Sequence, residues 1–207
     1  MPDEIKELKS LRLLIVSDNQ LSKQEKIKIQ ENLPKCLIQD ENSLYYLQNL
    51  PKKDEVIFAL DWGHMQLSEL PSHFGKFTDL RWLYLHYNNL EKLPFDIGKL
   101  IHLQELILSY NKISELPREI GKLARLRHLN LGCNSLYSIP REIGNLKDLI
   151  FLNLEENPIT KLPIEMSRQT NLEYLDLEWT NLDNQEKAKI KKLLPHCKII
   201  FNTNQDF

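Results

Sequence analysis

Histidine, cysteine and serine residues are the side chains of this sequence whose types could support chemistry. His64 and His86 together could bind a zinc or nickel ion, because imidazole nitrogens are common ligands of both metals. Cys133 follows His128 by five residues, and a thiol next to an imidazole base is the pair that a cysteine nucleophile requires. Ser109 adds a hydroxyl that could act as a nucleophile. Whether any of these groups meet depends on the elements that carry them.

A period of 23 residues organises almost the whole chain. The repeated unit reads L-x-x-L-x-L-x-x-N-x-L-x-x-L-P-x-x-I-G-x-L-x-x. Three residue types keep the step, namely Pro71, Pro94, Pro117, Pro140 and Pro163, then Gly75, Gly98, Gly121 and Gly144, and Asn88, Asn111, Asn134 and Asn157. Units begin at Leu11, Pro34, Ile57, Leu80, Leu103, Leu126, Leu149 and Leu172. At the asparagine position the third unit has Met65 and the last unit has Thr180.

Each repeated position has a physical reason. The alternation of Leu83, Tyr84 and Leu85 predicts a short strand with one face buried. An asparagine directly after the strand can hydrogen-bond backbone groups where the chain turns away. The I-G-x-L segment supplies apolar cover for the opposite side. Because one unit cannot bury its leucines alone, the units must stack into one continuous core.

This repeat resembles that of the leucine-rich-repeat family. It is most similar to the 23-residue class with the motif L-P-x-x-I-G-x-L, found in Ras-associated intracellular members and in short bacterial proteins, and the resemblance covers roughly residues 11–201. The resemblance implies an α/β fold, a solenoid shaped as a horseshoe arc, with a concave parallel β-sheet and a helical or irregular convex side. It also implies a function in protein–protein interaction.

The two ends of the chain resemble each other and predict caps for the solenoid. Ser22 with Glu25, and Asp183 with Glu186, have the spacing of helix N-caps. A helix over 184–194 followed by a strand from Lys198 would then shield the C-terminal end of the core. We expect a single leucine-rich-repeat domain over 1–207, with an N-terminal cap and cap-like repeat at 1–33, repeats at 34–182 and a C-terminal cap helix and strand at 183–207.

The strand positions that point away from the core decide what a partner meets. They are the third, fifth, seventh and eighth residues of each unit, 32 residues in all. Nine of them are acidic and none is Lys or Arg, whereas the rest of the chain holds 20 acidic and 27 basic residues. Seven are aromatic. The sequence therefore predicts an acidic, aromatic concave face on a nearly neutral protein.

Two interpretations of this face stay open. In the first, the charges only solvate an open sheet, and aromatic residues are present because they favour strands. In the second, Trp82, Tyr84, Tyr87 and Tyr110 form one exposed cluster on adjacent strands, and such clusters mark binding sites. The second predicts a protein partner with a basic surface and disfavours nucleic acid, whose phosphates would meet carboxylates. The candidate partner-binding residues are Trp82, Tyr84, His86, Tyr87, Ile107, Tyr110, Phe151, Glu155, Glu156, Tyr174, Asp176, Glu178 and Trp179.

The same arrangement weakens the chemical candidates. Two histidines on adjacent strands make a weak metal site, so a metal at His64 and His86 would be incidental. Cys133 and His128 lie too far apart along one strand to touch, and the sequence suggests no oxyanion donor for Ser109. We therefore expect a binding protein without catalytic residues, metal or cofactor. The alternatives are a self-associating structural protein, and an adaptor or inhibitor of a partner enzyme.

Composition limits the setting. The formal net charge is −2, and no run of eighteen apolar residues is present, so we expect no membrane insertion. Residues 1–10 lack the apolar run of a signal peptide, and Cys36, Cys133 and Cys197 are an odd, widely spaced set, which favours a reducing compartment. We expect a cytoplasmic monomer, with self-association and export by a non-classical route as the alternatives.

Overall fold

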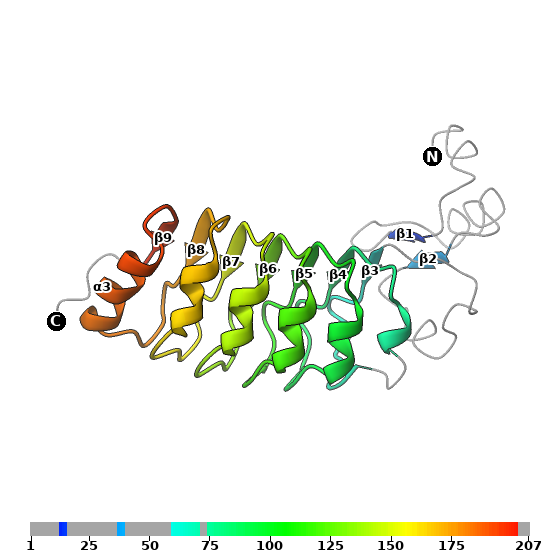
Figure 1. The fold of residues 1–207 in the computed structure, drawn as a ribbon. Coiled ribbons are helices and arrows are strands. Elements are labelled where there is room, and N and C mark those ends of the chain that lie inside the picture. Colours follow the sequence, from blue (N-terminus) through cyan, green and yellow to red (C-terminus); the bar gives the residue numbers. More distant parts are fainter. Residues whose placement is uncertain (1–12, 16–36, 40–58, 71–73, 203–207) are drawn as a thin grey trace, which may run out of the picture.

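Seven short parallel strands form one open sheet in the computed structural model, which describes residues 13–15, 37–39, 59–70 and 74–202 (Figure 1). Neighbours in the sheet are also neighbours along the chain. The strands are β3 (Ala59–Asp61), β4 (Trp82–Tyr84), β5 (Glu105–Ile107), β6 (His128–Asn130), β7 (Phe151–Asn153), β8 (Tyr174–Asp176) and β9 (Lys198–Ile200). This is the predicted solenoid, in which every unit adds one strand to the same side.

The leucines of the repeat form one continuous core. Within the unit that begins at Leu103, the side chains of Leu106, Leu108 and Ile113 are completely buried. The register of the strands places each such leucine beside its equivalent, so that Leu83 pairs with Leu106. At the N-terminal end, Trp62, Met65, Phe74 and Phe77 are buried in leucine positions, as the sequence predicts.

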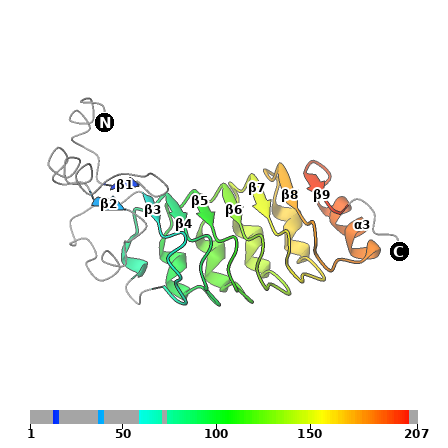
Figure 2. The same cartoon turned by 180° about the vertical axis from the view of Figure 1, so that it is seen from behind.

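Short 3-10 helices stack along the side opposite the strands (Figures 1 and 2). They are η2 (Phe74–Lys76), η3 (Phe95–Lys99), η4 (Arg118–Lys122), η5 (Arg141–Asn145) and η6 (Ile164–Arg168). A proline stands directly before each of the last four, where its fixed φ and missing N–H suit the start of a helix. The repeated glycine within these helices allows close stacking. A Cβ on Gly121 would lie 2.6 Å from the backbone oxygen of Glu142 in the next helix.

The repeated asparagines hydrogen-bond the backbone of the preceding unit. Asn134 accepts a hydrogen bond from the N–H of Ile113 at 3.0 Å, and its amide nitrogen donates to the carbonyl oxygens of Leu108 and Leu131, both at 3.0 Å. Asn88, Asn111 and Asn157 make the equivalent bonds in their own units. The predicted role of the asparagine is therefore confirmed, and each one joins two turns of the solenoid.

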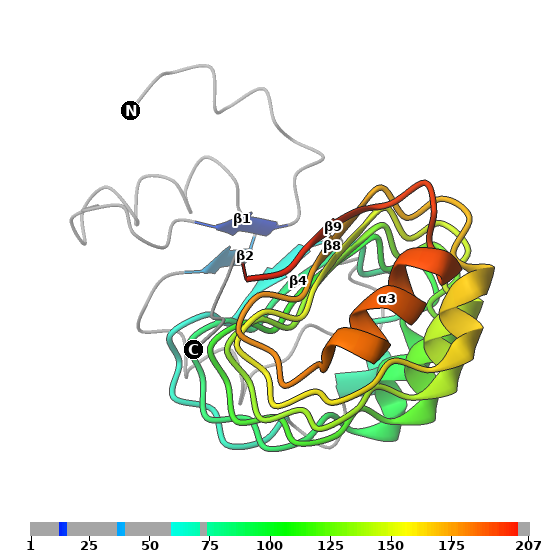
Figure 3. The ribbon, with the colours of Figure 1, turned by 90° about the vertical axis from the view of Figure 1, so that its left-hand side faces the viewer.

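The helix α3 (Asn184–Leu193) lies across the C-terminal end of the stacked turns, as Figure 3 shows along the axis of the solenoid. Asp183 caps it, because its Oδ1 accepts a hydrogen bond from the N–H of Glu186 at 2.7 Å. The Glu186 carboxylate turns to the previous unit, where its Oε1 accepts a hydrogen bond from the N–H of Leu162. Ile190 and Leu194 are buried against the core, so this end has the predicted cap. No helix among the described residues is long and apolar enough to cross a membrane.

The first two units depart from the predicted register. Their strands, β1 (Leu13–Ile15) and β2 (Leu37–Gln39), form a separate two-stranded parallel sheet. The period of 23 would place Leu13 opposite Cys36, but Leu13 pairs with Leu37. A shift of one residue exchanges the two faces of a strand, so the sequence pattern does not assign sides to this pair. The predicted N-terminal helix and the division at residue 33 lie outside the described residues.

Replacing Asn134 with alanine tests the asparagine bonds. We expect Asn134→Ala to lower the free energy of unfolding by about 2–4 kcal/mol, because it leaves a buried N–H and buried carbonyl groups without partners. Urea denaturation followed by circular dichroism measures this loss. The neighbouring exposed residue provides the control, and Ser135→Ala should change the stability by less than about 0.5 kcal/mol. Equal stability of both variants would contradict the role of the asparagine.

A second variant tests the stacking of the helices. We expect Gly121→Ala to cost about 1–3 kcal/mol of stability, since the added methyl group would meet the backbone of Glu142. Thermal denaturation gives the comparison with Ser167→Ala, the matched change at the same place of a later unit, where the residue is exposed. A stability of Gly121→Ala at or above that of Ser167→Ala would show that the close approach is not limiting.

Candidate binding surface

The side of the β3–β9 sheet that faces away from the core is called the open face below, and it is the face predicted to be concave. The third and fifth residues of each unit reach it directly from the strand. The eighth residue reaches it by another route, because Tyr87, Tyr110, Cys133, Glu156 and Trp179 all have φ between 49° and 57°. Non-glycine residues seldom adopt this left-handed conformation. Their N–H groups pair with the next unit, as in the bond from Tyr110 to Gly132, so the stacked backbone stabilises it.

Aromatic rings stack on the part of the open face that β3, β4 and β5 carry. The rings of Tyr87 and Tyr110 are parallel, with centroids 4.2 Å apart, and His64 stacks on the other side of Tyr87 at 4.5 Å. Both tyrosines are 47% exposed. The sequence predicted one cluster with Trp82 and Tyr84, but the ring contacts of the described residues join Tyr87 to histidines instead. The exposed cluster is therefore a ladder formed by the eighth residues of successive units.

Tyr84 lies on β4 itself and is half-buried. Its hydroxyl donates a hydrogen bond to Glu105 Oε2 at 3.4 Å. Burial, followed by the charge of Glu105 and the hydrogen bond to it, raises the pKa of Tyr84 to about 12. Trp82 is half-buried in the same strand, next to Glu105 on β5. These two residues form the lower part of the open face beside the ladder.

Carboxylates gather on the part of the open face that β7 and β8 carry. Oxygen atoms of Glu155, Asp176 and Glu178 all lie within 4.8 Å of one another. This group was not predicted, because it joins a fifth residue to two seventh residues of neighbouring units. Asp176 is buried, and its oxygens accept hydrogen bonds from the N–H of Glu178 and the hydroxyl of Tyr174. Asp176 therefore holds the turn, whereas the two glutamates are open to a partner.

The charges of the open face are not neutralised within the described part of the chain. Its four ion pairs lie on the helical side or in the cap, and they are Lys99–Asp96, Arg118–Glu119, Arg141–Glu142 and Lys189–Glu186. Lys198 of β9 is a basic residue on the open face that the eight repeat units do not contain, and its Nζ lies 5.5 Å from the ring centroid of Tyr174. An acidic patch thus remains at Glu155, Glu156 and Glu178.

Further aromatic side chains border the acidic patch. The rings of Phe151 and Tyr174 are parallel, with centroids 5.1 Å apart. Trp179 is 57% exposed and, with Glu156, lines a shallow hollow at the edge of the sheet. Ile107, the remaining candidate, is half-buried on β5. The structure thus places the predicted partner-binding residues on one face, in an aromatic part and an acidic part.

The chemical candidates do not form catalytic pairs among the described residues. His128 contacts the ring of Phe151, whereas Cys133 lies next to Tyr110 and Glu156. Burial and the neighbouring carboxylates raise the pKa of the Cys133 thiol, so the thiolate is disfavoured. His64 and His86 do come together, edge to face, with ring centroids 5.2 Å apart.

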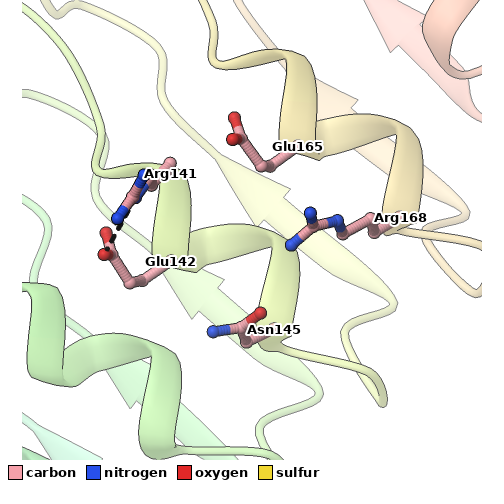
Figure 4. A pocket seen from close by; sticks show the side chains of 5 residues that line it. All are labelled: Arg141, Glu142, Asn145, Glu165 and Arg168. Carbon is pink, nitrogen blue, oxygen red and sulfur yellow. Dashed lines mark hydrogen bonds and ion pairs between the residues drawn. The ribbon is translucent and has the colours of Figure 1, made fainter.

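A hollow also lies on the helical side, between η5 and η6, and Figure 4 shows its lining. Arg141 and Arg168 stand beside Glu142 and Glu165, with Asn145 below them. Arg141 pairs with Glu142 at 3.3 Å. Because the two positive and two negative charges cancel, this hollow selects no ligand charge. The open face, with its charges of one sign, is the stronger candidate for recognition.

Two family models match the chain. A leucine-rich repeat region matches residues 55–130, and a leucine rich repeat matches residues 124–182. Together they span more than half of the 207 residues. No curated protein matches the sequence.

Solved structures agree with the family models. A leucine-rich-repeat protein of Leptospira interrogans has a TM-score of 0.77 at 36% identity, and the match covers 97% of this chain and 51% of that one. An internalin of Listeria monocytogenes, at 18% identity, shares the fold with a TM-score of 0.68 over 97% of this chain and 59% of its own. A chain from the BIR3–SERK2 complex of Arabidopsis thaliana has a TM-score of 0.51 at 28% identity, over 65% of this chain and 72% of that one. This chain therefore spans about half of the Leptospira protein.

The raised pKa of Tyr84 gives a test of the open face in alkaline solution. The unfolded-state pKa of tyrosine is about 10, so the stabilisation from this group is complete below pH 10 and is lost as the pH rises through about 12. We expect Glu105→Gln to lower the pKa of Tyr84 only part of the way to 10, because burial is the larger cause. Ultraviolet titration, with Tyr84→Phe subtracted to isolate this residue, measures it. A titration of Tyr84 near pH 10 in the wild type would contradict the geometry.

Proposed function

This chain belongs to the leucine-rich-repeat family, and we propose that it binds a partner protein through the open face of its sheet and catalyses no reaction itself. Members of this family generally mediate protein–protein interaction. The proposal goes further, to the surface used and to its chemistry. It assigns the partner a basic, partly apolar surface.

The observation that carries this proposal is the contrast between the two sides of the solenoid. On the helical side, the charges pair with each other, as Arg118 does with Glu119. On the open face, Glu155, Glu156 and Glu178 have no basic partner among the described residues, although they lie close together. Grouped like charges repel one another, so an arriving cation would be favoured there.

The aromatic ladder supplies the apolar part of such an interface. Tyr87 and Tyr110 present large, fixed rings that lose little conformational freedom on binding. Tyrosine and tryptophan are enriched among the residues that contribute most to protein interfaces. The similar chain in the BIR3–SERK2 complex comes from an assembly of proteins, which supports the same class of function here.

Affinity capture with a matched pair of variants tests the proposed function. The bait is the chain as wild type and as Tyr87→Ser/Tyr110→Ser, and lysates of the source organism and of candidate host cells supply the partners. We expect a protein held by the wild type to fall at least tenfold in yield on the ladder variant, because the stacked rings are lost. Quantitative mass spectrometry reads the yields.

Tyr137→Ser provides the control, since Tyr137 is 67% exposed but lies outside the open face. It should capture as the wild type does. Capture that fell with Tyr137→Ser and persisted with the ladder variant would move the binding surface away from the open face. Growth of the particle size with protein concentration, without any captured partner, would favour the self-associating alternative.

A further inference from the structure

The aromatic ladder and the acidic patch lie a short, fixed distance apart on the open face. Tyr110 belongs to the unit of β5, Glu155 to that of β7 and Glu178 to that of β8. Neighbouring strands in a sheet are about 4.8 Å apart, so two to three strand spacings separate the ladder from the patch, roughly 10–15 Å. The hydrogen-bonded stacking of the units makes this distance a constant of the fold.

The surface between the two is low and uncharged. At the seventh position, Ser109 and Gly132 are buried and carry at most a hydroxyl group. A Cβ on Gly132 would lie 2.9 Å from Glu155 Cγ, so the glutamate side chain leans over this glycine. No charged side chain of the described residues stands between Tyr110 and Glu155 in this row. A chain could therefore cross from the ladder to the patch in close contact with the sheet.

Side chains, rather than backbone, must recognise such a chain. Strands β4 to β8 each pair with a strand on both sides, so the middle of the sheet offers no free edge to which a peptide strand could be added. A partner that lies across these strands is held through the rings and carboxylates that project from them. The spacing of its own side chains then decides whether it can reach both parts.

We propose that the occupant of the open face is an extended segment of the partner protein, with a large apolar side chain on the ladder and an arginine three to five residues away in the acidic patch. This rests on the proposed function and adds the chemistry of the partner. An extended chain advances about 3.3 Å per residue, so three to five residues cover the 10–15 Å between the two parts.

Arginine fits the acidic patch better than lysine does. Its planar guanidinium can donate to two carboxylates at once, and Glu156 and Glu178 are both available. The exposed ring of Trp179, in the unit that follows Glu156, offers a flat surface on which a guanidinium can stack. A lysine ammonium would gain the charge attraction without the planar contacts.

Selection of displayed peptides tests this proposal. Random twelve-residue peptides are selected on the immobilised full chain, and the recovered sequences are aligned. We expect a Trp, Phe, Tyr or Leu with an Arg three to five residues from it. In synthetic versions of the best peptide, moving the two residues next to each other or eight residues apart should raise the Kd at least tenfold, as measured by calorimetry, since only one part can then be occupied.

Variants of the chain connect the peptide to the two parts. Glu156→Gln/Glu178→Gln should remove the preference for Arg over Gln in the peptide, and Tyr87→Ser/Tyr110→Ser should remove the preference for the apolar residue. Glu142→Gln, a carboxylate on the helical side, is the matched control and should leave both preferences unchanged. Circular dichroism confirms that each variant is folded.

Two results would overturn the proposal. One is an enriched motif without the apolar–arginine spacing, or one whose binding ignores both double variants. The other is a selection in which no peptide is enriched, because an extended segment is then not the occupant. The proposed function would survive the second result if capture of a folded protein still depended on Tyr87 and Tyr110, so the two failures are distinguishable.

Discussion

Every unit of this solenoid must turn its backbone inside the core, where polar groups without partners are costly. Asn88, Asn111, Asn134 and Asn157 meet this demand, because each side chain bonds an N–H and carbonyl groups that belong to two successive turns. Three of the four are buried, so water cannot replace these bonds. The asparagine thereby fixes both the shape of a turn and its distance from the next one. Where Thr180 replaces it, one bond to the Leu177 carbonyl oxygen remains.

The shape of that turn determines what the open face presents. The residue before each asparagine is held in the left-handed conformation, and its side chain projects from the edge of the sheet. Rings at this position in successive units therefore stack, as Tyr87 and Tyr110 do at 4.2 Å. A binding surface built in this way is rigid before a partner arrives, which reduces the entropy lost on binding. The fifth residue adds to this rigidity where it is Asp or Asn, since Asn130 and Asp176 each accept a hydrogen bond from a backbone N–H two residues on.

Charge is distributed according to the same division of the unit. The 3-10 helices carry acidic and basic residues in adjacent rows, and these pair with each other on the outside of the solenoid. The strand side carries carboxylates whose positive counterparts are absent from the described part of the sheet, apart from Lys198 at its C-terminal edge. Leucines and asparagines leave the four outward positions of each unit free to vary. Specialisation of the surface thus costs the scaffold little.

The sequence by itself determined the repeat, the parallel sheet, the buried leucines, the role of the asparagines and the C-terminal cap. It could do so because each depends on a pattern within one unit of 23 residues, or on the identity of neighbouring units. It also named the residues of the open face, since strand alternation assigns them. Only the tertiary structure decided how those residues meet. The ladder of His64, Tyr87 and Tyr110 depends on a left-handed backbone that no glycine announces, and the group of Glu155, Asp176 and Glu178 joins different positions of adjacent units. The pairing of Leu13 with Leu37 likewise departs from the period, because a degenerate unit no longer fixes its own register. Periodicity specifies the spacing of the backbone, whereas contacts between side chains of neighbouring turns depend on dihedral angles and packing that one unit does not contain.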